Sequence, residues 1–214
     1  MSARHALATA GIGLLALLWF GPLPVLARSS FAAHMAMHMG VVAIAAPLLA
    51  AAVADTWLDP ARRWPHGWMA APWWALLASV VEFLLVWAWH APALHLLGRG
   101  SATAMVAEQA SFLFAGLLLW VAALGQGRMP SRERAAAGTL ALLLTATHMT
   151  LLGVLLAMSG RLLYAHAGHG DVAQALHDQQ AGGVLMLVIG GVSYLVGALV
   201  LLRRLLNPRR EVHG

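Results

Sequence analysis

Cysteine is absent from this chain of 214 residues. Disulfide frameworks, thiolate zinc sites and iron–sulfur clusters are therefore excluded, because each of them needs cysteine sulfur. A metal site in this protein has to be built from histidine, methionine and carboxylate side chains. The lack of thiols also suits an oxidising compartment, where exposed cysteines would be oxidised.

Charged residues are scarce as well, at 10% of the sequence, whereas 61% of the residues are hydrophobic. This composition excludes an ordinary soluble domain and is typical of a multi-pass membrane protein. Apolar stretches that approach the roughly 20 residues needed to cross a bilayer occupy about residues 6–26, 32–54, 70–90, 103–124, 136–158 and 181–202. The sequence therefore predicts an all-α bundle of about six transmembrane helices, in a single domain over residues 1–214.

The positively charged residues are distributed unevenly between the two ends of these stretches. Ten of the 13 lie on the side of the termini, and only Arg28, Arg99 and Arg161 lie on the opposite side. Because such residues stay on the cytoplasmic side during insertion, we expect both termini in the cytoplasm and the protein in a bacterial plasma membrane. The same asymmetry explains the net charge of +5 without a nucleic-acid partner.

The first apolar stretch has an alternative interpretation. Arg4, the apolar run and the tripeptide Val25-Leu26-Ala27 resemble a secretory signal with its cleavage site. Cleavage would leave five spans and an external N-terminus, with the later helices oriented as before. We expect the stretch to be retained as a span, because its apolar run is long.

Soft metal-binding side chains gather at the start of the second span, in the segment His34-Met35-Ala36-Met37-His38-Met39. An α-helix turns about 100° per residue, so His34, Met37 and His38 share one face. Imidazole nitrogen with thioether sulfur suits Cu(I) better than Mg, Ca or Mn. The alternative is that these histidines only form hydrogen bonds between helices. We interpret the segment as a copper site in the outer part of the membrane.

Further polar residues lie at membrane depth or at the outer ends of the spans. His90 ends the third span and His148 lies near the middle of the fifth, and we expect both to converge with the first two histidines. Glu82 lies deep in the third span, where an ionisable group costs about 2.5–3.5 kcal/mol on insertion scales. It either joins helices or balances the charge of a bound cation. Glu108 and Asp178, near the outer ends of their spans, are the other supporting carboxylates.

Glycine recurs at fixed intervals in the last span, at Gly183, Gly190 and Gly197. Small residues permit close backbone approach between helices in lipid, where the hydrophobic effect does not drive association. We interpret this stripe as a packing seam without chemistry of its own.

Five motifs in order along the chain resemble the CtaG-like family of bacterial cytochrome c oxidase assembly factors, which is associated with caa-type oxidases. They are His34–Met39 with Ala46–Leu49, Val86–Pro92, Phe112–Trp120, His148-Met149 with Leu163-Tyr164, and Asp178–Met186. The positions of His34, His38, His90, His148 and Asp178 match the family pattern. Gln109 departs from it, because a histidine is expected after the glutamate at the head of the fourth span.

The resemblance implies a membrane protein that helps a haem-copper oxidase to mature by assisting copper insertion from the outer side. Oxidase subunits, periplasmic copper chaperones and membrane lipid are the implied partners. We expect no enzymatic activity, because the sequence has no Ser-His-Asp or Cys-His arrangement and no phosphate-binding glycine loop. Three alternatives remain at this point: a copper or cation permease, a b-type haem protein with two axial histidines, and a structural membrane partner.

Overall fold

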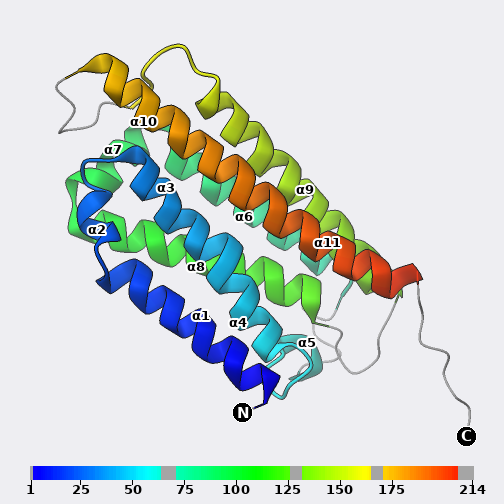
Figure 1. Ribbon diagram of the computed structural model, residues 1–214. Helices are drawn as coiled ribbons and strands as arrows, with labels where there is room; N and C mark the ends of the chain where they lie inside the picture. The colour runs from blue at the N-terminus through cyan, green and yellow to red at the C-terminus, as the bar shows by residue number, and fades with distance from the viewer. Residues whose placement is uncertain (1, 64–70, 126–131, 165–170, 207–214) are drawn as a thin grey trace, which may run out of the picture.

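The computed structural model describes residues 2–63, 71–125, 132–164 and 171–206, and this part of the chain contains helices but no strand. Figure 1 shows most of the helices running side by side along one common direction. The elements are α1 (Ala3–Phe20), α2 (Leu23–Leu26), α3 (Phe31–Met39), the π-helical turn η1 (Gly40–Ala45), α4 (Ala46–Val53), α5 (Pro60–Arg63), α6 (Trp74–His90), α7 (Pro92–Gly100), α8 (Ala102–Leu124), α9 (Arg132–Ala157), α10 (Val172–Leu185), the π-helical turn η3 (Met186–Gly190) and α11 (Gly191–Leu206).

The number of membrane crossings agrees with the prediction. Within the described residues, five helices are long and apolar enough to cross a membrane, and a sixth crossing results if α6 and α7, which are bent by 74°, count as one span. The predicted all-α bundle of about six spans is therefore confirmed. The second and fourth predicted spans, 32–54 and 103–124, differ by one residue or less at each end from Phe31–Val53 and Ala102–Leu124.

The first and last spans, Ala3–Phe20 and Val172–Leu206, differ from the predicted 6–26 and 181–202 at both ends, and most at the end of the first and the start of the last. The first helix ends at Phe20, because its C-cap Gly21 has extended backbone geometry and Pro22, which has no N–H to continue the helix, follows directly. The last helix starts at Val172, well before residue 181, because the side chain of Asp171 caps it by accepting a hydrogen bond from the N–H of Ala173. The first turns of this helix are polar, so hydrophobicity along the sequence does not include them in the predicted span.

Close backbone contacts hold the last span against its neighbours. A Cβ on Gly183 would collide with the backbone of Ala157, and one on Gly197 would lie 2.6 Å from the ring of Trp120. Gly190 has more room, since its nearest contact would be 3.5 Å away. The predicted glycine seam thus permits close approach at its two ends.

Two polar side chains accommodate the π-helical turn η1 in the second span. A π turn withdraws carbonyls from the regular α-helical pattern. Trp120 donates its indole N–H to the Val42 carbonyl at 3.1 Å, and Ser193 donates its hydroxyl to the Ala43 carbonyl at 2.5 Å. These bonds tie α8 and α11 to the second span where its backbone would otherwise be unsatisfied in lipid.

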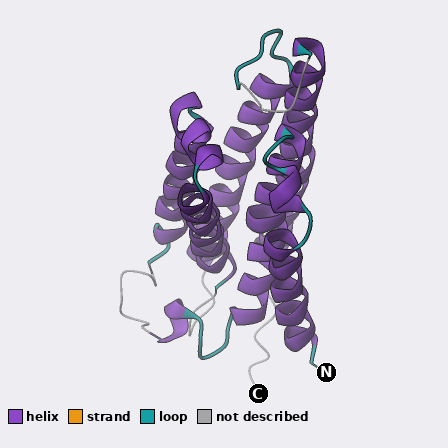
Figure 2. Ribbon diagram, turned by 90° about the vertical axis from the view of Figure 1, so that its left-hand side faces the viewer, coloured by secondary structure: helices purple, strands orange, loops and turns teal. Residues whose placement is uncertain are grey.

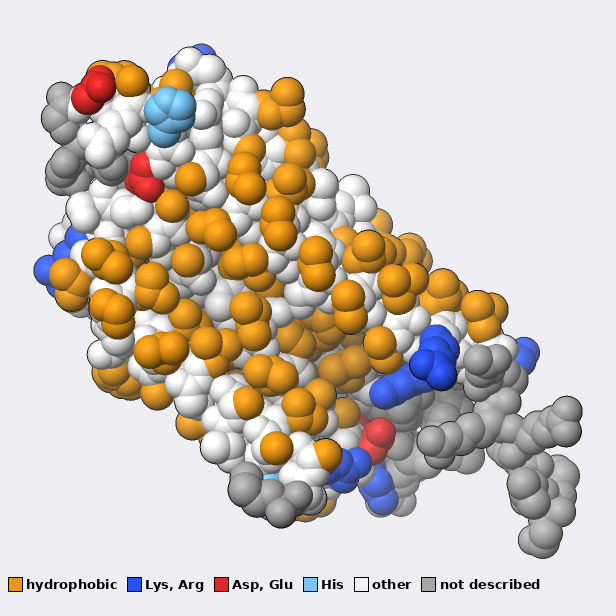
Figure 3. Space-filling view, viewed as in Figure 1, with side chains coloured by type: hydrophobic (Ala, Val, Ile, Leu, Met, Phe, Trp, Pro, Cys, Tyr) orange, Lys and Arg blue, Asp and Glu red, His pale blue; other side chains and the backbone are white. Residues whose placement is uncertain are grey.

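The two ends of the bundle differ in charge. Figure 1 shows that α1 begins and α11 ends at one end, whereas α7 and the start of α10 lie at the other, and the turned view in Figure 2 also shows the helices running lengthwise. Figure 3 shows apolar side chains over the middle of one face and most of its visible arginine at the end of the bundle where α5 lies and α11 ends. Arg62, Arg63, Arg203 and Arg204 are exposed. We expect this end to face the cytoplasm.

Single cysteines test this orientation, since the chain has no cysteine of its own. Arg132 and Arg161 are both exposed, at opposite ends of the bundle. In intact cells, a membrane-impermeant maleimide is expected to label the Arg161→Cys variant and to spare the Arg132→Cys variant until the cells are opened. The reverse pattern would show that the bundle is inserted the other way round.

Candidate metal centre

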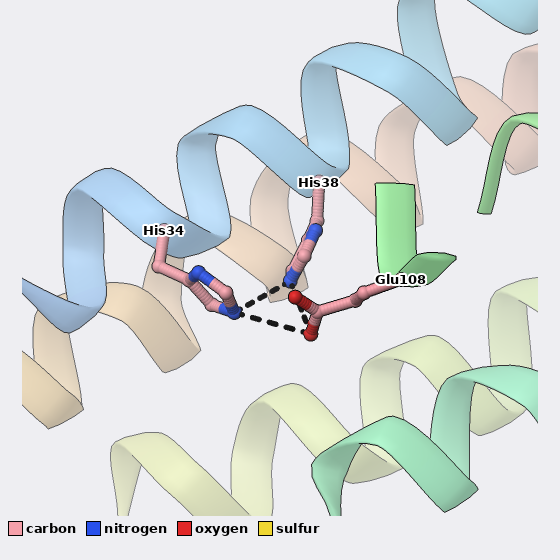
Figure 4. Close-up of side chains that lie close together, drawn as sticks. All are labelled: His34, His38 and Glu108. Carbon is pink, nitrogen blue, oxygen red and sulfur yellow. Dashed lines mark hydrogen bonds and ion pairs between the residues drawn. The ribbon is translucent and has the colours of Figure 1, made fainter. Parts of the chain in front are cut away.

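Two histidines and a glutamate meet inside the half of the bundle that lies away from the start of α1 and the end of α11. His34 and His38 lie one turn apart on α3, and Figure 4 shows both imidazoles turned toward Glu108 of α8. The two Nε2 atoms are 2.8 Å apart, and each lies 3.4 Å from Oε1 of Glu108. All three residues are only 1% exposed. The residues therefore form a closed polar group with no access to water.

The donor atoms of this group are arranged as metal ligands. One ligand atom from each of His34, His38 and Glu108 lies within 4.8 Å of the other two. Among the described residues, this is the only group in which three or more histidine, aspartate or glutamate side chains come so close together. His34 Nδ1 and Glu108 Oε2 are buried without a hydrogen-bond partner, which is costly. Two nitrogens bound to one ion at about 2.0 Å in tetrahedral geometry lie about 3.3 Å apart. An ion would thus have to separate the two rings slightly as it replaces their hydrogen bond.

A chain of hydrogen bonds fixes the proton of His38. The indole of Trp19 on α1 donates to Oε1 of Gln109 at 3.4 Å, so the amide nitrogen of Gln109 faces Nδ1 of His38, 2.9 Å away. Nδ1 therefore accepts, and the neutral ring carries its proton on Nε2, from which it donates to His34. For an ion to bind at Nε2, this proton has to move to Nδ1, and Gln109 has to turn its amide oxygen toward Nδ1 to accept it. Gln109, at the position where a histidine was expected, is thus a cross-helix hydrogen-bonding residue.

His90 and Met35 lie at the edge of the group. His90 donates from Nδ1 to the Val86 carbonyl at 2.7 Å, which leaves the lone pair of its Nε2 facing the sulfur of Met35 at 3.4 Å. The ring centroids of His90 and His38 are 6.3 Å apart. Met35 is thus the methionine whose sulfur contacts a histidine of this neighbourhood, and Met37, which the sequence predicts as a ligand, is buried at 1% exposure.

The helix α7 contributes a histidine that the sequence analysis did not include in the site. The ring centroid of His95 lies 5.0 Å from that of His34, with the rings perpendicular, and 4.4 Å from that of Tyr164. Tyr164 in turn donates its hydroxyl to the His90 carbonyl at 2.7 Å. Burial raises the pKa of Tyr164 to about 12, so the hydroxyl remains a donor at neutral pH. The sequence does hold one indication of this contact: His95 and Gly98 are three residues apart in a helix that Pro92 begins, so they share one face.

The structure does not place His148 and Glu82 in contact with this group. The His148 ring lies 5.3 Å from that of Phe83, and both of its nitrogens lack a hydrogen-bond partner. Glu82 accepts a hydrogen bond of 2.5 Å from the hydroxyl of Tyr194 and also faces Thr145. These contacts form a second buried polar group, which joins α6, α9 and α11.

Asp178 caps the helix that carries the histidines. Its carboxylate accepts hydrogen bonds from the Ser30 hydroxyl at 2.7 Å, the Phe31 N–H at 2.5 Å and the Ala32 N–H at 3.3 Å. The first N–H groups of a helix have no partner within it, and a carboxylate there also interacts favourably with the helix dipole. Asp178 on α10 thereby fixes the start of α3, one turn before His34.

Removal of the Asp178 carboxylate is expected to destabilise the protein. For Asp178→Ala we expect the free energy of unfolding to fall by about 1–2 kcal/mol, because two backbone N–H groups lose their partner. Thermal unfolding in detergent, followed by circular dichroism, measures the change. His177→Ala alters an exposed residue of the same helix and is the matched control. Equal stability of the two variants would show that the cap is dispensable.

Comparison with known proteins gives one match. The model of the cytochrome c oxidase caa3 assembly factor family, Caa3_CtaG, matches residues 1–207. No curated protein and no solved structure matches the chain.

Proposed function

The chain belongs to the cytochrome c oxidase caa3 assembly factor family, and we propose that it serves the oxidase by holding a copper ion between His34, His38 and Glu108 and delivering it. An assembly factor of this family implies the oxidase as a partner. In this proposal the protein is a metallochaperone for the respiratory chain, without a catalytic reaction of its own. Copper is its cargo, received from the outer side, for which periplasmic copper chaperones are the proposed donors.

The buried group of two imidazoles and one carboxylate is the observation that carries the proposal. Among divalent first-row metals, a nitrogen and oxygen site binds Cu(II) most tightly. The sulfur of Met35 and the free Nε2 of His90, 3.4 Å apart at the edge of the group, are donors suited to Cu(I). The neighbourhood thus offers ligands to copper in both oxidation states, and it lacks thiolates that would retain the ion.

The location of the group supports delivery on the outer side of the membrane. His34 and His38 lie on the first helix of the second span, toward the end of the bundle opposite to the termini. The arginine-rich end, which we expect in the cytoplasm, is the other one. The ion would accordingly be held near the outer surface of a bacterial plasma membrane, and lipid surrounds the apolar flanks of the bundle.

Copper binding is expected to depend on the three residues of the group. The variants His34→Ala/His38→Ala and Glu108→Gln are expected to lose stoichiometric copper, because each removes ligand atoms from a buried site with few substitutes. Metal analysis of protein purified after loading with copper measures this. Glu82→Gln removes a buried carboxylate of the second polar group and Met37→Leu replaces a core thioether, so both are expected to retain the metal. Full copper content in the histidine double variant would exclude this site.

Cells that lack the protein are expected to make the oxidase polypeptide and its haem but to show low oxidase activity. Added external copper is expected to restore part of this activity, because the proposed defect lies in metal supply. Oxidase activity, haem content and copper content of membranes measure the three quantities separately. Normal copper in an inactive oxidase would contradict the proposal.

Two measurements on the same purified protein test the alternative functions of a b-type haem protein and a copper permease. A b-type haem protein would show a Soret band in its absorption spectrum. A permease would carry copper into sealed vesicles, whereas a chaperone is expected to bind copper without net flux.

A further inference from the structure

The helix α7 covers the metal group on its outer side. The chain bends by 74° between α6 and α7, and Figure 1 shows α7 at the end of the bundle, near the start of α3. His95 and Gly98 are the buried residues of this helix, whereas Leu96 and Leu97 on its other face are 50% and 54% exposed. One face of α7 therefore lies on the group, and the other faces away from the bundle.

The contacts between α7 and the group are direct. The His95 ring stands edge-on to that of His34, with their centroids 5.0 Å apart. A Cβ on Gly98 would lie 3.1 Å from Oε2 of Glu108, so the absence of a side chain at this position lets the backbone of α7 approach the carboxylate. A shift of α7 away from the bundle would thus expose both a histidine and the carboxylate.

The attachment of α7 is polar at its C-terminal end and broken at its N-terminal end. The guanidinium of Arg99 donates to the carbonyl of Ala27 at 2.7 Å and to that of Arg28. At the other end, Ala91 has extended backbone geometry with ψ of 132°, and Pro92 has no N–H with which to continue α6. The helix is therefore joined to α6 by a bend, packs on α8, and is tied by Arg99 to the two residues that follow α2.

We propose that α7 is a movable gate over the copper group and that His95 is the ligand through which the ion enters and leaves. The proposal rests on the proposed function, since it concerns passage of the same ion. His34, His38 and Glu108 are each 1% exposed, so the ion cannot pass unless a covering element moves. His95 is the histidine carried by that element.

The transfer is a ligand exchange without a redox step. A bond forms between a ring nitrogen of His95 and the ion, and the bond between the ion and Nε2 of His34 breaks. The neutral imidazole of His95 supplies one lone pair, so no electron leaves the metal. On departure of the ion, the His38 proton returns from Nδ1 to Nε2, and the hydrogen bond to His34 forms again.

The rate of copper transfer tests the role of His95. Full-length protein loaded with Cu(I) is mixed with an excess of a water-soluble Cu(I) chelator, and the rate of colour formation is recorded. His95→Phe keeps an aromatic ring against Tyr164 but has no nitrogen. It is expected to retain bound copper and to transfer it at least about tenfold more slowly. Leu96→Ala, on the exposed face of the same helix, is the matched control and is expected to transfer at the wild-type rate.

Each result of this experiment is decisive. A wild-type rate in His95→Phe would overturn the transfer role, and loss of copper at equilibrium would overturn it in another way, since His95 would then be a permanent ligand. If the phenylalanine variant does not fold, His95→Gln is measured in its place, with the same expectation. A wild-type protein that binds no copper would instead refute the proposed function.

Arg99 tests the movement of the gate independently. Arg99→Gln removes the charge-assisted hydrogen bonds to the carbonyls of Ala27 and Arg28, so we expect copper transfer to become about tenfold faster with unchanged copper content. A rate equal to that of the wild type would show that α7 does not move during transfer, whatever the effect of the His95 variants.

Discussion

The constraint on which the half of the molecule around α3 and α7 depends is that buried imidazoles have to form hydrogen bonds with one another where water is absent. His34 and His38, each 1% exposed, solve this by a mutual hydrogen bond of 2.8 Å. That bond has a fixed direction only because Gln109 donates to the far side of His38, and Gln109 is in turn oriented by Trp19. A single chain of hydrogen bonds therefore connects α1, α8 and α3. The position of the proton on His38 thus depends on how these three helices are aligned.

The sequence alone predicted those features that a single helix determines. Apolar length predicted the crossings, and the period of the α-helix placed His34 and His38 on one face, as the structure shows. Both predictions rest on local geometry, which needs no knowledge of neighbouring helices. The spacing of the glycines similarly predicted close approach in the last span, and Gly183 and Gly197 have backbone or ring neighbours at contact distance.

Features that depend on which helices meet were beyond the reach of these arguments. Met35 and Met37 are equally good thioethers in sequence, but only the position of α6 brings His90 to Met35. His95 follows the third predicted span, and the 74° bend after His90 turns its segment back over the site. Glu82 shares a helix with His90, yet its neighbours Tyr194 and Thr145 come from other spans. The depth of a residue in the membrane therefore does not predict which residues of other helices it contacts.

The π-helical turn η1 has a consequence for how the metal site is encoded. A π turn holds one residue more than an α turn, so it advances the angular phase of the helix by about 100° at that point. Here the turn, Gly40–Ala45, separates the face bearing His34 and His38 from α4, which packs against α1 and α8. Deleting one residue within it would leave every ligand in the sequence and rotate the histidines away from Glu108. The site is thus specified by the number of residues between two packing surfaces as much as by its ligands, and a protein with the same histidines but a regular second span would need a different arrangement of helices to bring them together.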